Sequence, residues 1–599
     1  MNAIQKNELV KYLVNLSLIF NIIYIFIILR VPPTSGYEIS LYLVYPWYFW
    51  ISIILNIVIA QTILIVTALS EDKNNDKSNL GIITGFIAIS VLLFLPLIRG
   101  YFSYERSDVL SHIGLVRDIL NSGSINNNYY PIMHILVSIL FFVSHIEITT
   151  FTMIIPPLFS IFYVGSFYLL SKHIFKKRSE ILFCLVFALI PVFGNGNLAL
   201  SPYPMSYLLF PFIFYLFFKS RYSKLNVPFR ILLIILVLQS VFFHPLNAIM
   251  LFLIFFVMVL SSYINNILFN HSVELGNMSS IFGIIFIAFM SWQSYSYLLI
   301  NSSYKAYMWL NGELNSSSEF AKYSSLANTV NLNPAEFINL ALNGYGQSIM
   351  LGLLSILCIL HLIHIFLKER SIGFIQLFSA FVFLVFFILT ISSFFSYYIV
   401  GFGRYYMIAI LFSFILIPST ICSILKPHQS SKPYYFKLAI LILALIFITS
   451  FSTFNLYQSP RIKYVGQQVA SSEFYGMKIF FDKRNDDLSI YEYGPSQGRF
   501  YDAIFGQNSK RKNIRAEADA ALAVLPPHFG YATNSTLGST YKDPIYFILT
   551  DAGRDFYRYV FPEYISRWKF TSGDFNTLKK DTSVEQIYTN GNLEAYLAL

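Results

Sequence analysis

The chain has 599 residues, of which 56% are hydrophobic and only 12% are charged. Soluble domains carry about 25% charged residues, so this composition excludes an ordinary soluble protein and indicates a polytopic membrane protein. The net charge of +10 does not indicate nucleic-acid binding, because Lys and Arg lie mostly in short loops between apolar segments. Cys184, Cys358 and Cys422 lie within apolar segments, so we expect neither a disulfide framework nor a Cys/His metal site.

Long apolar segments dominate the first three quarters of the chain. Most approach the length that a helix needs to cross a bilayer, so they predict an all-α polytopic bundle of about 13–14 spans. The predicted spans lie near residues 12–29, 42–69, 80–98, 149–171, 179–197, 204–218, 229–245, 247–267, 280–300, 346–367, 373–398, 404–425 and 434–453. The segment 131–145 is also apolar, but it is short for a full crossing, so it fits a re-entrant half-helix or a full span.

Short basic loops such as SKHIFKKRSE and FKSRYSKLNVPFR connect several of these segments. Basic loops favour the cytoplasmic side, and all of them lie there if 131–171 makes one net crossing. The two long loops, 99–130 and 301–345, then lie outside the cell together with the chain end. If 131–145 crosses fully, SKHIFKKRSE lies outside and the later loops invert. We expect the first arrangement, in a multi-pass protein of the plasma membrane.

Charged residues become frequent after about residue 454. This change predicts a soluble, extracytoplasmic α/β domain over 454–599, distinct from a transmembrane domain over 1–453. The segment DPIYFILT predicts a strand and DFNTLKK predicts a helix. The final VEQIYTNGNLEAYLAL predicts two strands joined at Asn590-Gly591, because Asn-Gly is a strong signal for a tight hairpin.

The stretch YERSDVLSHIG follows the third predicted span and holds the candidate catalytic residue Asp108. Ser107 is a favourable helix N-cap, and Gly123 lies where such a helix would stop. Asp108 and His112 then lie one turn apart on the same face. Another face carries an apolar stripe formed by Val109, Ile113, Val116 and Leu120. We expect this helix to lie on the outer membrane surface with the stripe in the lipid.

A carboxylate at the lipid–water boundary could accept a proton from an attacking hydroxyl. A neighbouring imidazole could orient the carboxylate or contact a phosphate. The alternative is that Asp108 is a solvated residue that stabilises the first helical turn and that His112 is an interfacial histidine.

Three further polar residues stand at predicted outer ends of apolar segments. His134 lies in the first turn of the segment 131–145 and would face the same cavity. His244 precedes Pro245, which breaks the helix, and broken membrane helices mark cavities. Arg404 opens a span after two glycines and could bind a phosphate through two hydrogen bonds. Each is also explained as a plain interfacial side chain, and for Arg404 that means snorkelling to lipid headgroups.

The loop 301–345 is long for a connection between two spans, and long loops are often functional lids. Tyr304, Tyr307, Trp309 and Glu313 in this loop suit stacking against a sugar or capping of a site. An ordinary surface loop fits the same residues.

The order of these parts resembles the GT-C fold of polyprenyl-phosphate-dependent glycosyltransferases, and especially archaeal-type relatives of dolichyl-phosphate-mannose mannosyltransferases. The stretch SDVLSHIGLVRDILNSGSINNNYYPIMHIL carries the resemblance, and LSPYPMSYLLFPFIFYL, HPLNAI, GRYY and VEQIYTNGNLEAYL agree with it. The family's first-loop Asp is the catalytic base and maps onto Asp108. A second acidic residue often accompanies it, and Glu105 lies close by. The chain has no WWDxG-like acceptor motif, which argues against asparagine-linked transfer.

The resemblance implies an inverting transfer of one sugar from a polyprenyl (dolichyl) phosphate to a hydroxyl of a protein or glycan acceptor, at the outer face of the bilayer. Asp108 would be the base, and Arg404 or His244 would stabilise the leaving phosphate. The further candidates for substrate binding are Glu105, His112 and His134. The scheme needs no metal and no cofactor.

Two other classes of protein stay open. One is a transporter or flippase of lipid-linked glycans, and the other is a non-catalytic membrane scaffold. A transferase predicts that Asp108, His244 and Arg404 converge on one cavity that opens to lipid.

Overall fold

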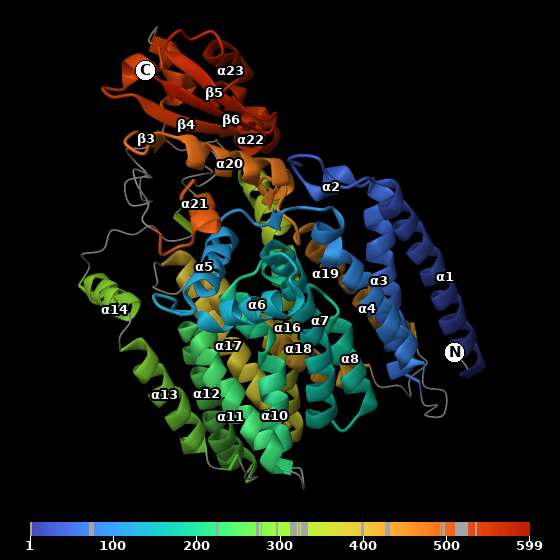
Figure 1. Ribbon diagram of the computed structural model, residues 1–599. Coiled ribbons are helices and arrows are strands. Elements are labelled where there is room, and N and C mark those ends of the chain that lie inside the picture. The colour runs from blue at the N-terminus through green and yellow to red at the C-terminus, as the bar shows by residue number, and fades with distance from the viewer. Residues whose placement is uncertain are drawn as a thin grey trace.

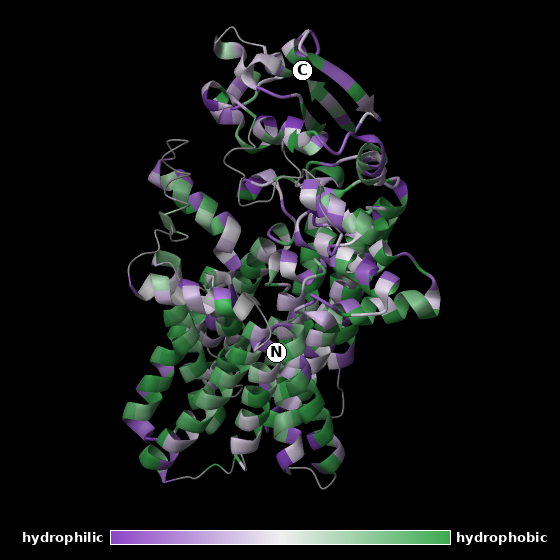
Figure 2. Cartoon of the chain, turned by 60° about the vertical axis from the view of Figure 1, so that its left-hand side comes forward, coloured by the Kyte–Doolittle hydropathy of each residue, from purple (hydrophilic) through white to green (hydrophobic). Residues whose placement is uncertain are grey.

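The computed structural model describes residues 3–70, 77–222, 226–270, 273, 275–276, 278–294, 297–311, 320–321, 324, 333–396, 401–425, 432–491, 493, 497–509, 525–533 and 536–599. A bundle of helices forms the larger part of the molecule, and a smaller mixed α/β part from the C-terminal segment sits on one end of it (Figure 1). The bundle is hydrophobic along most of its length, whereas the C-terminal part carries many hydrophilic residues (Figure 2).

Ten helices within the described residues are long and apolar enough to cross a membrane. They are α1 (Ala3–Arg30), α3 (Trp47–Ala68), α4 (Ser78–Ile98), α7 (Ile148–Ile174), α11 (Asn226–Phe243), α12 (Pro245–Phe269), α16 (Pro334–Glu369), α17 (Phe374–Phe395), α18 (Phe402–Ile424) and α19 (Lys432–Phe454). The predicted all-α polytopic bundle is therefore confirmed. Most side chains of α3 and α18 are buried, so these two helices form much of its interior.

Three predicted spans are shorter helices in the structure. The segments 179–197, 204–218 and 280–300 correspond to α8 (Arg178–Ala188), α10 (Phe210–Tyr222) and α13 (Met278–Gln293). Between α8 and α10 the chain passes through η1 (Gly194–Asn197) and α9 (Pro202–Leu208). The prolines and glycines of PVFGNGNLALSPYP interrupt the apolar run there and end the helix early. Over the described residues ten helices reach spanning length, and the other three predicted spans are the shorter or interrupted helices α8, α10 and α13.

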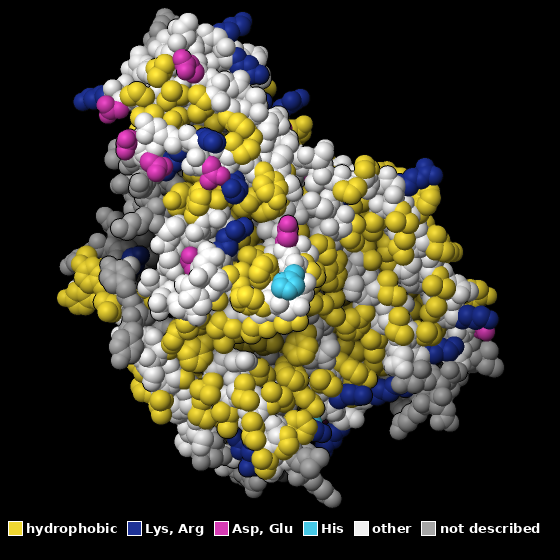
Figure 3. Space-filling view, viewed as in Figure 1, with side chains coloured by type: hydrophobic (Ala, Val, Ile, Leu, Met, Phe, Trp, Pro, Cys, Tyr) yellow, Lys and Arg dark blue, Asp and Glu magenta, His cyan; other side chains and the backbone are white. Residues whose placement is uncertain are grey.

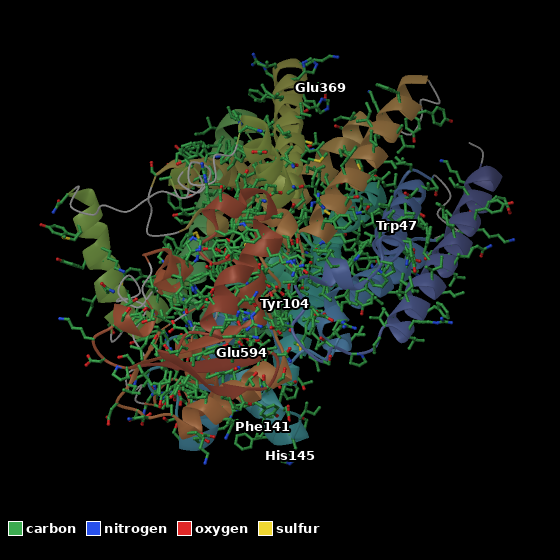
Figure 4. The ribbon with its side chains drawn as sticks, turned by 90° about the horizontal axis from the view of Figure 1, so that it is seen from above. Trp47, Tyr104, Phe141, His145, Glu369 and Glu594 are labelled. Atoms are coloured by element: carbon green, nitrogen blue, oxygen red, sulfur yellow. The ribbon has the colours of Figure 1, made fainter. Side chains whose placement is uncertain are left out.

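The ambiguous segment 131–145 forms α6 (Pro131–Ser144), a helix of 14 residues. Such a helix is about 21 Å long, which is less than the ~30 Å hydrocarbon core of a bilayer, so α6 does not cross by itself. Seen from above, the C-cap residue His145 lies at the edge of the molecule, whereas Tyr104 lies near its middle (Figure 4). The crossing after this point is made by α7, as the first of the two predicted arrangements requires.

The C-terminal part is built on a four-stranded sheet with the order β3-β4-β6-β5. Its strands are β3 (Ser489–Tyr491), β4 (Ile545–Thr550), β5 (Val584–Thr589) and β6 (Leu593–Ala598), and its helices are α20 (Ser471–Lys483), α21 (Gln497–Phe505), α22 (Asp551–Val560) and α23 (Ser572–Leu578). The predicted strand, helix and hairpin are confirmed. At the hairpin the Asn590 side chain accepts hydrogen bonds from the N–H groups of Asn592 and Leu593, and Gly591 takes a positive φ of 91°, which glycine adopts without strain.

The loop 99–130 is joined to the C-terminal part. Its strand β1 (Ser103–Tyr104) pairs antiparallel with β2 (Gln468–Val469), and its helix α5 (Asp108–Ser122) packs against α21. Three residues of the predicted apolar stripe, Val109, Ile113 and Val116, are fully buried. They pack in a cluster with apolar residues of the C-terminal part, among them Phe474, Met477, Phe500 and Ala503. The expectation that this stripe lies in lipid is therefore wrong, because protein covers it.

The surface of the molecule is apolar around the helical bundle and charged around the C-terminal part. A broad hydrophobic face covers the bundle, Lys and Arg gather along its lower border, and charged side chains of both signs occupy the C-terminal part (Figure 3). Ten apolar helices and this face identify an integral, multi-pass membrane protein. The division of the chain into domains 1–453 and 454–599, and the placement of the second outside the cell, stay predictions.

Candidate functional site

The chain enters α5 through a turn that Glu105 stabilises. Glu105 has a positive φ of 86°, which is uncommon for a residue with a side chain. Its carboxylate accepts hydrogen bonds from the N–H of Val109 at 2.9 Å and from the N–H of Ser107 at 3.0 Å. Burial raises the pKa of Glu105, and the hydrogen bonds from Ser107 and Val109 oppose that rise. Ser107 occupies the predicted N-cap position, but its own side chain makes no capping hydrogen bond, and Glu105 takes over that role.

Asp108 is the first residue of α5, and an arginine from the C-terminal part pairs with it. The guanidinium of Arg499 lies 3.1 Å from the Asp108 carboxylate and also donates to Ser111 Oγ at 2.9 Å. Ser111 in turn donates to the Asp502 carboxylate at 2.7 Å. The Asp108 side chain nevertheless keeps 63% of its surface exposed. Asp108 is therefore both oriented and accessible.

His112 and His134 form a buried pair beside Asp108. His134 Nε2 lies 3.0 Å from His112 Nδ1, and His134 Nδ1 lies within hydrogen-bonding distance of the Asn128 side chain. Burial lowers the pKa of His112 to about 4; the nearby Asp108 carboxylate opposes this shift, and Arg499 adds to it. Both rings are therefore neutral near pH 7, so in the hydrogen bond between them one nitrogen donates and the other accepts.

A second chain of contacts runs through aromatic rings. Tyr130, the N-cap of α6, stacks on His244, the N-cap of α12, with ring centroids 4.9 Å apart and 8° between the ring planes. His244 also contacts Tyr203 of α9, with ring centroids 5.9 Å apart. The guanidinium of Arg404, in the first turn of α18, lies 4.9 Å from the centre of the Tyr203 ring. These contacts join the starts of α6, α9, α12 and α18.

The two sets of residues also interact through their charges. Burial raises the pKa of Tyr130, the Arg404 charge opposes that rise, and the Asp108 charge adds to it. The structure thus brings five predicted site residues into one cluster at these helix starts: Asp108, His112, His134, His244 and Arg404. We call it the helix-start cluster. Helix starts present unsatisfied N–H groups and a partial positive charge, so the cluster suits an anion.

Three residues that contact the helix-start cluster were not predicted from the sequence. Arg499 lies some 390 residues after its partner Asp108 in the chain, in an amphipathic helix that carries no local sign of a site. Tyr203 and Asn128 lie within the stretches LSPYPMSYLLF and SINNNYYP, but nothing in their spacing indicates a contact with His244 or His134. Only the tertiary fold brings these side chains together.

A large apolar cavity lies on the other face of α18. Its volume is about 1040 Å³, and aromatic and aliphatic side chains of α16, α17 and α18 form most of its wall. Phe402 and Tyr406 of α18 line it, whereas Arg404 between them turns to Tyr203. None of the six predicted site residues lines this cavity. Asp108, His244 and Arg404 therefore share a cluster as expected, but none of them lines this cavity, which begins beside Arg404 at Phe402 and Tyr406 on the other face of α18.

The predicted sugar-stacking residues of the loop 301–345 are only partly described. Tyr304 and Tyr307 lie on α14 (Tyr297–Leu310) and are exposed. Glu313 and the side chain of Trp309 lie outside the described residues. The residues that the structure describes contain no group of three or more His, Cys, Asp or Glu side chains that could hold a metal ion.

Comparisons with known proteins give similarities of structure. No family model and no curated protein matches the chain. The chain is similar to the Archaeoglobus fulgidus oligosaccharyltransferase in its apo form, with a TM-score of 0.46 and 10% identity over 78% of this chain and 69% of that chain. It is also similar to ArnT from Cupriavidus metallidurans bound to undecaprenyl phosphate, with a TM-score of 0.45 and 10% identity over 87% of this chain and 98% of that chain. Each TM-score is below 0.5.

Proposed function

We propose that this protein is an inverting membrane glycosyltransferase. It moves a sugar from a polyprenyl phosphate, such as dolichyl phosphate, to a hydroxyl of a protein or glycan acceptor at the outer face of the bilayer. The observation that carries the proposal is the helix-start cluster: an exposed, oriented carboxylate at Asp108 lies in the same cluster as an arginine and as helix starts that favour a phosphate.

Asp108 is the proposed general base. It takes the proton of the acceptor hydroxyl as that oxygen forms a bond to the anomeric carbon of the donor. The bond from this carbon to the phosphate oxygen breaks on the opposite side, so the configuration inverts and the polyprenyl phosphate leaves as an anion. Arg499 pairs with the Asp108 carboxylate at 3.1 Å, and Glu105 fixes the turn before it, so both are positioning residues.

Arg404 and His244 are the proposed partners of the donor phosphate. Among the described residues, Arg404 forms no salt bridge, and its guanidinium lies over the ring of Tyr203. His244 Nδ1 is buried and has no hydrogen-bond partner within the described part of the chain. A phosphate oxygen would satisfy both groups, and charge that develops on a leaving phosphate is stabilised by such donors. His112 of α5 and His134 of α6 are the proposed further substrate-binding residues of the same site.

The apolar cavity beside α18 is the proposed place for the isoprenoid chain of the donor. Its wall consists mainly of aromatic and aliphatic side chains, and Phe402 and Tyr406 connect it to the turn that holds Arg404. Holding both reactants at the lipid–water boundary supplies much of the rate through proximity.

The test is transfer by the purified protein from a panel of radiolabelled polyprenyl-phosphate sugars, compared with the Asp108→Asn variant. Loss of a positioned general base lowers a rate by about 10²–10⁴-fold. The control is Asp118→Asn, which changes the other carboxylate of α5 and should leave transfer intact. Near-normal transfer by Asp108→Asn would refute the role of Asp108. Movement of the lipid-linked sugar across the membrane without transfer to any acceptor would favour a flippase instead.

A further inference from the structure

The helix α22 separates the large apolar cavity from a second cavity in the C-terminal part. Phe556 and Tyr557 line the apolar cavity, whereas Arg554, Asp555 and Arg558 line the second cavity on the other face of the helix. Trp568 lines both cavities. We call the second cavity, which has a volume of about 610 Å³, the tail pocket.

The base of the tail pocket is aromatic. Phe570 and Phe575 line it, and both side chains are buried. The indole N–H of Trp568 donates to the carbonyl oxygen of Phe561 at 2.7 Å, which fixes the plane of the ring. Aromatic surfaces of this kind offer an apolar face and little conformational freedom to lose, so they suit the C–H faces of a sugar ring.

The rim of the tail pocket is basic and polar. Arg558 and Lys579 are exposed, and neither forms a salt bridge within the described part of the chain. Arg554 pairs with Glu594, and Asp555 is the acidic side chain among the described residues that line the pocket. Because Glu594 neutralises Arg554, two cations, Arg558 and Lys579, face one carboxylate among the described lining residues, which leaves the pocket positive. The remaining polar lining consists of two hydroxyls and an amide, from Thr571, Ser572 and Asn576.

We propose that the tail pocket binds a sugar that carries an anionic group, a carboxylate or a phosphate, and that this sugar belongs to the acceptor. An aromatic base, hydroxyl and amide groups, and two cations that form no salt bridge within the described residues match the ring, the hydroxyls and the negative charge of such a ligand. The inference rests on the proposed function, because only a protein that transfers a sugar has an acceptor.

The bound sugar is assigned to the acceptor because of where the tail pocket lies. None of its lining residues belongs to the helix-start cluster, so the group that it holds is not the one being transferred. The shared Trp568 places the pocket next to the cavity proposed for the lipid chain of the donor. Binding a remote part of the acceptor there would position its reacting hydroxyl, which is how enzymes use binding energy away from the reacting atoms.

The experiment measures the affinity of the full-length protein in nanodiscs for three soluble tetrasaccharides. They are tetragalacturonate, the same tetrasaccharide with its carboxyls reduced to alcohols, and the reduced form with one 6-phosphate. We expect the uronate, the phosphorylated form or both to bind at least about tenfold more tightly than the neutral form, as a charge-assisted contact requires. Tight binding of the uronate alone or of the phosphorylated sugar alone would support the proposal and name the anion.

Matched variants decide whether the tail pocket is responsible. Arg558→Gln with Lys579→Gln should abolish the preference for the charged sugar, whereas Lys542→Gln with Lys580→Gln should retain it, because these exposed lysines lie outside the pocket. Equal affinity for charged and neutral sugars would overturn the proposal. Equal loss of the preference in both double variants would also overturn it, since general surface charge would then explain the binding.

The same assay on the Asp108→Asn protein separates this inference from the proposed function. Binding should be unchanged there, because Asp108 does not line the tail pocket. Normal transfer by Asp108→Asn together with selective binding of the charged sugar would refute the role of Asp108 alone. Lost transfer by Asp108→Asn without any charge preference would refute the tail pocket alone.

Discussion

Arg404 illustrates how the surroundings of one side chain separate a functional role from a passive one. A snorkelling arginine would extend to headgroups, but this guanidinium lies over the ring of Tyr203, beside His244 and Tyr130. The ring restricts the orientation of the guanidinium without satisfying its N–H groups. Within the described part of the chain the planar fork forms no salt bridge, so it can bind an oxyanion.

The substitution Arg404→Lys should weaken use of the donor more than it weakens the fold. It keeps the charge but loses the fork, so we expect the KM for the polyprenyl-phosphate sugar to rise about tenfold with little change in thermal stability. Arg30→Lys is the matched control, because Arg30 is the last residue of an apolar helix, whereas Arg404 lies in the first turn of one, and it also lies close to an aromatic ring, 4.6 Å from that of Phe26. An unchanged KM in Arg404→Ala would leave snorkelling as the explanation.

The buried pair of His112 and His134 makes stability depend on pH. Burial lowers the pKa of His112 to about 4, below the ordinary value of about 6.5, so the unfolded chain binds a proton that the folded protein does not. The contribution of neutral His112 to the free energy of unfolding is therefore fully present above about pH 6.5. It falls as the pH decreases towards 4, by up to about 1.4 kcal/mol per pH unit. Burial lowers the pKa of His134 as well, which adds to the same trend.

The measurement is the thermal midpoint of unfolding between pH 7.5 and pH 4.5 for the wild type and for His112→Gln. Glutamine keeps a hydrogen bond to His134 but does not titrate, so the variant should show a shallower decline. The groups that face His112 are Asp108, Arg499 and His134. Identical slopes for the two proteins would mean that His112 does not contribute to the pH dependence.

At the scale of elements, the sequence was most informative where the signal is local. Apolar length predicted the ten long helices, and Asn590-Gly591 predicted the final hairpin because a tight turn needs φ > 0 at Gly591. Apolar length was misleading for α8 and α10, because proline and glycine interrupt the apolar segment that holds these two helices. The sequence was also misleading for α5, because an amphipathic stripe looks the same whether lipid or protein covers it.

In the candidate site, too, the sequence predicted local features but not contacts between distant elements. Asp108, His112, His134, His244 and Arg404 were predictable because each lies at a helix start next to a proline, a glycine or a polar stretch. Arg499 was not predictable, since its contact with Asp108 depends on how α21 packs on α5. Packing between elements that are distant in the chain produces no periodic pattern of residues in the sequence.

The contact between α5 and α21 is close at Gly114. A Cβ atom there would lie 2.5 Å from the carbonyl oxygen of Asp502, so Gly114→Ala must push the two helices apart. We expect a loss of about 1–3 kcal/mol in the free energy of unfolding, as overpacking typically causes. Because Arg499 sits on α21, transfer should also fall.

The matched control is Gly165→Ala in α7, where an added Cβ would meet no atom within 4 Å. Alanine favours a helix by up to about 1 kcal/mol over glycine, so this variant should be as stable as the wild type or more stable. Thermal unfolding and the transfer rate are the readouts for both. Wild-type stability in Gly114→Ala would show that α5 and α21 can separate freely.

At the scale of the whole molecule, the loop 99–130 and the C-terminal part lie on the same end of the bundle and share one apolar cluster. They must therefore lie on the same side of the membrane. Figure 3 shows Lys and Arg at the opposite border of the apolar face, and basic borders face the cytoplasm. We propose that the helix-start cluster and the C-terminal part are both outside the cell.

Cysteine labelling tests this orientation. Lys580→Cys places a thiol on the exposed surface of the C-terminal part, and Glu369→Cys places one at the end of α16, towards the opposite border. An impermeant maleimide should label the first variant in intact cells and the second only after permeabilisation. The reverse pattern would invert the topology and contradict the charge argument.

The short pairing of β1 with β2 has a consequence for how the protein is made. Ser103 pairs with Val469, so the first outer loop is synthesised long before the strand that completes it. At ordinary rates of translation of about 5–20 residues per second, Ser103 is made roughly 20–70 s before its partner. During that interval the apolar stripe of α5 can pack on α6 and α7 but lacks the cover that the C-terminal part supplies, so lipid or a chaperone must shield that side. A ribosome that stalls before residue 469 would thus leave a membrane-inserted chain whose outer loop still exposes apolar residues and can aggregate.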